Sequence, residues 1–381
     1  ARYYPPKYLT RETLAWMEHS FVDGRVTKGK LLYDGPTREF PFTAGGGKFE
    51  IRGQVRDGVY GFLPGWQPVR QAEVDVAIDR DQVRVTGQGR IGNLAATDVV
   101  VQTQLANGRE EVHVRAAVNG PVNDALGVLY GIAPGADGAA WTRYLPAGLQ
   151  ASGNGALALT VAVPLDTAPV RVRGEYRFQQ AGVREPDSGV AVDVLEGQVR
   201  FDENGLRDSQ LRGRFLGGDA TLTAAQDGHQ FVIYGQGRIA ADGLHAVLGP
   251  KIAPQVSGAT GWNATWRSLK GSGALQAELG LRGLKSRLPP PLHFPDGLPV
   301  EKLVLKTETA TGDSHVLALS AGNRIGGRLV LQRRAGAWQF AGGRVGFGEE
   351  RTPPARGRGV HLSVQIDALA LDPWFPLLGQ E

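Results

Sequence analysis

The chain has 381 residues, with 42 Lys and Arg against 38 Asp and Glu, and a formal net charge of +4. Its length is ample for a large buried core, and so small an excess of basic residues does not indicate a nucleic-acid partner. The lack of cysteine excludes disulfides, thiol nucleophiles and cysteine-ligated metal sites. No apolar run approaches the roughly 18 residues that a membrane-spanning helix needs.

Helical periodicity appears in only three places. Residues 10–22 predict a first helix, with Thr10 placed to cap it and Gly24 to close it. Residues 121–130 predict a second short helix that starts at a proline. Residues 371–378 predict a third short element that prolines interrupt.

Alternation of apolar and polar residues with a period of two dominates the rest of the chain, as in residues 98–105 and 111–118. This pattern predicts roughly twenty half-buried strands. Turn signals such as Asp57-Gly58 and Asn204-Gly205 separate the runs at the spacing of hairpins. The sheet is therefore expected to be antiparallel.

Internal echoes indicate a repeated unit. Residues 132–134 and 155–159 are echoed by residues 252–254 and 273–277, at an offset of about 120 residues. We therefore predict three units, 1–118, 119–240 and 241–381, of which the third is the most degenerate. Because such a unit cannot bury its apolar face alone, the units are expected to stack into one continuous, elongated domain. The predicted fold class is mainly all-β, an elongated, curved antiparallel sheet built of repeats with a few short helices.

Residues 87–92 match the glycine fingerprint of dinucleotide-binding proteins, but a β-forming run follows where that site needs a helix. Residues 235–239 repeat the string, which favours glycines that bend or thin a sheet. Residues 45–48 resemble a phosphate loop but lack its Ser or Thr, and are interpreted as a plain loop.

The sequence offers no group of catalytic residues. The seven histidines lack metal-ligand spacing and are interpreted as solvated surface residues. In a strand, the adjacent carboxylates Glu110 and Glu111 would point to opposite faces, so they are interpreted as turn charges and not as an acid–base pair. We predict no enzyme, no cofactor and no metal.

Several segments, in order along nearly the whole chain, resemble the YhdP-like branch of the AsmA-like proteins, which are relatives of TamB. The likeness is carried by residues 24–35 with Phe40-Pro41-Phe42, by residues 53–68, by Gly120-Pro121, by residues 288–292 and by residues 371–374. The resemblance implies a β-sheet folded over, like a taco, into a continuous apolar groove that moves phospholipid toward the outer membrane. It also implies the periplasmic part of an inner-membrane-anchored protein of a Gram-negative bacterium. The chain starts without a methionine and is expected to be a central section, whose contacts with the inner and outer membranes lie in regions that it does not include.

The residues support this role on physical grounds. Moving a two-chain lipid through water exposes about thirty methylenes, at a cost on the order of 20 kcal/mol, so a conduit needs an apolar wall along its length. The apolar members of the alternating pairs are the candidate groove lining. They are Phe49, Ile51, Val74, Val76, Ile78, Val99, Val101, Val112, Val114, Leu157, Leu159, Val161, Val163, Val172, Tyr176, Phe178, Leu303, Leu305, Leu329 and Leu331.

Two alternatives stay open. If these residues form an ordinary closed core, the chain is a periplasmic scaffold for envelope assembly that carries no lipid. A β-solenoid enzyme acting on glycans is disfavoured, because it requires much shorter repeats.

Overall fold

The computed structural model describes most of the chain. The described residues are 20–61, 67–106, 108–131, 149–184, 191–227, 230–244, 251–269, 272–290, 292–296, 301–311, 314–322, 325–334, 337–347, 360–364 and 370–377. They divide into two compact units. The first consists of residues 1–143, 152–179 and 200–205, and the second of residues 144–151, 180–199 and 206–381.

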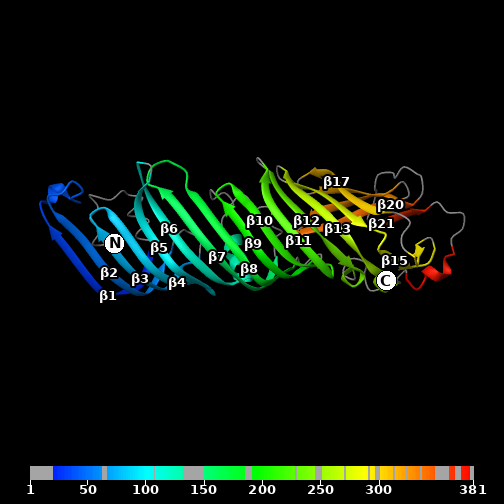
Figure 1. The fold of residues 1–381 in the computed structure, drawn as a ribbon, viewed down its shortest axis with the longest axis horizontal. Helices are drawn as coiled ribbons and strands as arrows, with labels where there is room; N and C mark the ends of the chain where they lie inside the picture. The colour runs from blue at the N-terminus through cyan, green and yellow to red at the C-terminus, as the bar shows by residue number, and fades with distance from the viewer. Residues whose placement is uncertain are drawn as a thin grey trace. The chain divides into compact units, whose positions relative to one another are not determined.

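The first unit is a run of long strands joined by short connections. Its strands β1 to β7 pair in chain order, every pair antiparallel, and β1 to β6 lie side by side in Figure 1. The elements are β1 (Phe21–Asp34), the 3-10 helix η1 (Thr37–Glu39), β2 (Lys48–Tyr60), β3 (Val69–Asp79), β4 (Gln82–Ile91), β5 (Leu94–Ala106), β6 (Arg109–Pro121), helix α2 (Val122–Gly131) and β7 (Gln150–Pro164). Strands β8 (Arg171–Arg184) and β9 (Ala191–Asp202) each contribute residues to both units.

The second unit has antiparallel neighbours from β10 to β20, and among the strand pairs described here only β20 and β21 are parallel. A small side sheet is formed by β15 and β16 against the start of β13. The elements are β10 (Gly205–Phe215), β11 (Gly218–Asp227), β12 (Gln230–Ala240), η3 (Ala241–Leu244), η4 (Ala253–Gln255), β13 (Val256–Leu269), β14 (Ser272–Gly280), β15 (Leu284–Arg287), β16 (His293–Phe294), β17 (Lys302–Thr311), β18 (Ser314–Ala321), β19 (Ile325–Arg334), β20 (Ala337–Phe347), β21 (Val360–Val364) and η5 (Asp372–Trp374).

The mainly β, antiparallel fold class with a few short helices is confirmed. The second helix is present as α2, and η5 lies within the predicted third element. Residues 10–19 of the predicted first helix and residues 132–134 of the predicted repeat lie outside the described residues. The three-unit division stays a prediction.

Two local predictions are wrong. Phe21 and Val22, assigned to the first helix, begin β1, and Gly24 lies inside that strand. Asp57-Gly58 is not a hairpin turn but lies within β2, at a register shift between Val55 and Gly58 where Asp57 has φ +54°. A bulge provides the positive φ that favours this dipeptide just as a turn does.

Fully buried side chains are few and mostly small. The buried apolar residues described include eight alanines, and Phe42 and Val122 are the largest of the side chains that are completely buried. Phe42 packs with Tyr33 and Phe40 in an aromatic cluster at the β1–β2 connection. In the second unit, Leu281 and Leu284 form a small closed core with Ala321. Most large apolar side chains therefore lie outside any closed core.

Candidate functional site

One face of the first unit is apolar across six consecutive strands. In an antiparallel pair, directly opposite residues project to the same face of the sheet, so the register shows which side chains are neighbours. One unbroken row of register partners crosses β2 to β7 as Gly53, Val76, Val85, Val101, Val114 and Val161. We call the surface built on this row the apolar face of the first unit.

The register brings thirteen of the predicted lining residues onto this face. They lie in β2, β3, β5, β6 and β7, and are Phe49, Ile51, Val74, Val76, Ile78, Val99, Val101, Val112, Val114, Leu157, Leu159, Val161 and Val163. Leu31, Val55 and Val83 share the face but were missed by the sequence analysis. Their alternation is as clear, and the same period-two signal would have found them.

The three predicted residues of β8 join the same face. A Cβ added at Gly155 of β7 would collide with the ring and hydroxyl of Tyr176, so Tyr176 lies over the face to which Leu157 belongs. Val172 and Phe178 share the alternation of Tyr176, and the rings of Tyr176 and Phe178 lie 4.9 Å apart, edge to face.

The second unit has an apolar face of its own. Leu305 follows Leu222, Gly235, Ala264 and Ala277 in a row of register partners from β11 to β17. Leu303, Leu329 and Leu331, the other predicted residues here, share this face. Trp262 and Trp266 also lie on it, although neither was among the predicted lining residues. Their period-two spacing around Ala264 was the available signal.

The exposed fraction of these side chains distinguishes an open face from a closed core. All twenty predicted lining residues are described, and each is half-buried, neither covered nor fully exposed. A closed core would bury most of them completely. Leu303 and Phe49 are partial exceptions: Leu303 packs against the closed core of Leu281 and Leu284, and Phe49 packs against Phe40 and Tyr33 in the aromatic cluster. Within the described residues, the apolar faces are thus only partly covered.

The opposite face of the first unit is charged and held by cross-strand ion pairs. Arg56 of β2 lies 3.4 Å from Glu73 of β3. Glu111 of β6, whose side chain is 5% exposed, accepts hydrogen bonds from Arg171 at 2.5 Å and from His113 at 3.0 Å. Glu110 and Glu111 do project to opposite faces, but the interpretation of Glu111 as a turn charge is wrong. His113 is likewise hydrogen-bonded to Glu111 and not simply solvated.

His315 also differs from the expected surface histidine. It lies on the apolar face of the second unit, opposite Leu331, and its burial lowers the pKa of the imidazole. Among the described residues there is no cluster of metal-ligating side chains.

Glycines thin the sheet beneath aromatic side chains. Gly155 lies under Tyr176, Gly174 under Phe201, and Gly235 and Gly237 under Trp262. The dinucleotide-like string in β4 has the same structural role, because a side chain at Gly87 would collide with the backbone of Glu73 and Val74. The strand β5, not a helix, follows it. The structural interpretation of both glycine strings agrees with this packing.

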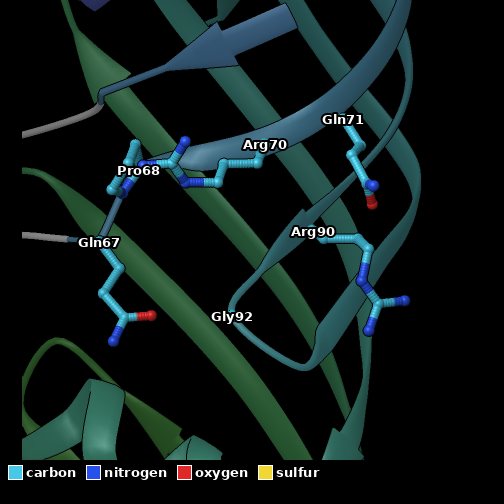
Figure 2. A pocket seen from close by; sticks show the side chains of 6 residues that line it. All are labelled: Gln67, Pro68, Arg70, Gln71, Arg90 and Gly92. Carbon is cyan, nitrogen blue, oxygen red and sulfur yellow. The ribbon is translucent and has the colours of Figure 1, made fainter. Parts of the chain in front are cut away.

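A cavity of about 450 Å³ lies at one edge of the first unit, where β3 begins and β4 ends. Figure 2 shows the Arg70 guanidinium beside Pro68 on one side of this cavity and that of Arg90 on the other, with Gln67 and Gly92 below. Both arginines are exposed.

None of the helices that the structure describes is long and apolar enough to cross a membrane.

Comparison of the chain with known proteins assigns it to a family. The family model described as YhdP protein matches residues 1–381, the entire chain. The chain belongs to the YhdP family. Its resemblance to YhdP-like proteins, read from short segments of sequence, is thereby confirmed.

A curated relative of this family is the Intermembrane phospholipid transporter YhdP of Escherichia coli (strain K12). It is 21% identical to the chain over 311 residues, which cover 78% of the chain but 24% of the relative. The chain thus matches about a quarter of that protein's length. No solved structure matches the chain.

Proposed function

We propose that this chain is a section of a non-enzymatic phospholipid conduit, which carries acyl chains along its apolar faces between the inner and outer membranes. In this role its place is the periplasm of a Gram-negative bacterium. Membership of the YhdP family and the name of the E. coli relative support phospholipid as the cargo.

The observation that carries the proposal is the half-burial of the predicted lining residues on faces that are continuous from strand to strand. An uncovered apolar surface of several strands is rare on a soluble protein and marks a site that binds apolar partners. The row from Val76 to Val161 crosses five strands that lie ~4.8 Å apart, so it extends about 19 Å without a charged side chain.

The chemistry of the two faces fits a lipid that slides and does not react. Each methylene that leaves water for the apolar face gains about 0.8 kcal/mol wherever it lies, so neighbouring positions along the rows are nearly equal in free energy. A nearly uniform wall holds the chains without trapping them. The charged opposite face keeps the section soluble while its apolar face is filled.

The alternative is a scaffold with a closed core and no lipid. The small core of Leu281, Leu284 and Ala321, against which Leu303 packs, is the one feature among the described residues that resembles it. It involves one of the twenty predicted lining residues. Among the described residues, support for the alternative therefore comes only from this small core.

The test is to purify the chain without detergent, record its native mass spectrum and extract its lipids. Phospholipid retained at a defined stoichiometry is the expected result. An apo mass, together with no uptake from added phospholipid vesicles, would contradict the conduit and favour the scaffold.

A further inference from the structure

Three of the four strands from β2 to β5 bulge at the same level of the first unit's sheet. Asp57 of β2, Gln71 of β3 and Asp98 of β5 have φ of +54°, +50° and +50°, and each lies at a register shift. Gln71 and Asp98 lie opposite residues 87–90 of β4, from its two sides, and Asp57 lies opposite residues 72–74 of β3. Because a bulge bends its strand, bulges in line bend the whole sheet. We call the line through these three residues the crease.

The sheet bends toward its apolar face at the crease. Gly58 and Ala72 are register partners on this face. A Cβ added at Gly58 would lie 3.2 Å from that of Ala72, whereas about 4.5–5.5 Å is usual for directly opposite residues. A Cβ added at Gly89 would lie 2.5 Å from Cγ1 of Val69. The apolar face is therefore crowded here, as the inner side of a bend must be.

Long polar side chains lie on the outer side of the crease. Arg56 lies 3.4 Å from Glu73, and Gln88 donates to the same carboxylate at 3.3 Å. On the inner side, Ala72 and Ala96 are each only 7% exposed, in contrast to the half-buried lining residues. The crease is therefore the closed floor of a groove whose inner wall is the apolar face.

The crease divides the strands into two unequal arms. On β5, the longer arm runs from Val99 to Leu105, which is six residues or about 20 Å, whereas the shorter arm from Leu94 to Ala96 spans about 7 Å. One leaflet of a bilayer core is about 15 Å thick. An extended acyl chain therefore fits along the longer arm and not along the shorter one.

The end of the longer arm, which we call the far edge, carries exposed apolar side chains on the apolar face. Leu105 pairs with Glu110, whose backbone oxygen accepts a hydrogen bond from the Leu165 amide at 3.0 Å, so the three side chains form one row. Leu105 is 73% exposed and Leu165 59% exposed. Beside them, Arg109 lies 3.5 Å from Asp166. Exposed leucines bordered by charges of both signs suit the boundary between acyl chains and a zwitterionic headgroup.

We propose that phospholipids lie in the groove of the first unit with their headgroups at the far edge and the ends of their chains at the crease. This inference rests on the proposed function. It adds the orientation of the lipid, and it assigns the edge at Leu105 and Leu165, not the edge beside α2, as the place where headgroups lie.

The lack of cysteine in the chain allows the orientation to be measured with single bimane labels. L105C places the label at the far edge, and V99C places it about 20 Å away at the crease, on the same face of β5. Q104C is the matched control, because Gln104 precedes Leu105 and lies on the opposite face. Each labelled chain is loaded from dioleoyl phosphatidylcholine vesicles that contain a phosphatidylcholine with a nitroxide on its headgroup or at its chain end, and is then separated from the vesicles.

The headgroup nitroxide should quench L105C severalfold more than V99C, and the chain-end nitroxide should do the reverse. Both nitroxides should quench Q104C less than the label on the apolar face. L165C and L159C, six residues apart on β7, repeat the comparison on a second strand, so a folding defect in one labelled chain does not decide the result.

Three results would overturn the inference and leave the proposed function intact. They are gradients of the opposite sign, equal quenching at both ends of each strand, and quenching of Q104C as strong as that of L105C. If the unlabelled wild-type chain takes up neither nitroxide lipid, the proposed function fails, and the inference fails with it.

Discussion

Replacing Val161 by Asp tests the apolar face most directly. Val161 lies on β7 at the end of the valine row, and its register partner is Val114. A carboxylate there removes contact with about three methylenes of a bound chain, which weakens lipid binding by about 2 kcal/mol, or about thirtyfold. Because Val161 is half-buried, the new carboxylate stays hydrated in the empty protein, and folding should lose only about 1 kcal/mol.

The matched control is Thr160→Asp. Thr160 is the preceding residue of the same strand, is exposed, and faces Arg115 on the polar side. It receives the same charge without touching the apolar face. Transfer of acyl-labelled phospholipid between vesicles measures the effect, and circular dichroism during heating confirms that both variants fold. Equal transfer by folded V161D and T160D would refute the assignment of this face.

Three further predictions follow from other positions. Leu305→Asp in the second unit should impair lipid transfer, whereas Val304→Asp, on the opposite face, should not. Equal transfer by the two variants would contradict the assignment of Leu305 to the lining. Gly155→Ala should lower the free energy of unfolding by about 1–3 kcal/mol, because the added methyl group displaces Tyr176. Gly127→Ala in α2, which has open space around it, should raise the free energy of unfolding by up to about 1 kcal/mol. Urea titration measures both changes, and an unchanged midpoint for G155A would contradict the packing of Gly155 under Tyr176. Burial raises the pKa of Tyr176 from 10.0 to about 12, so the folded state retains a proton that the unfolded state loses, and stability should fall as the pH rises from 10 to about 12. Tyr176→Phe should reduce that fall, and tyrosinate absorbance should show one tyrosine fewer with a delayed titration.

The composition of the faces could be predicted from the sequence because alternation is a property of a single strand. Val112 and Val114 must share a face whatever lies beside them, and so must Val161 and Val163. Whether Val114 and Val161 share a face depends on register, which a shift of one residue reverses. Bulges such as the one at Asp57 set that register, and the sequence signal for a bulge is the same as that for a turn.

The charge pattern at the edges could not be predicted in the same way. Glu111 and Arg171 are sixty residues apart, and only the pairing of β6 with β7 and the position where β8 starts bring them together.

Half-burial also links cargo to stability. Apolar side chains that the fold leaves partly exposed, such as Val76 and Val101, contribute less to folding than fully buried ones, because water still contacts them. In the proposed conduit, acyl chains on the apolar face would remove that water and bind only the folded sheet. They would stabilise it by RT ln(1 + [L]/Kd), about 2.7 kcal/mol at a hundredfold excess over Kd. A sheet that releases its lipid has to remain folded when the apolar face is empty. The cross-strand ion pairs of the opposite face, such as Arg56 with Glu73, are present with or without lipid. Under the proposed function, this division of labour between the two faces would allow one sheet to bind lipid, release it and stay folded.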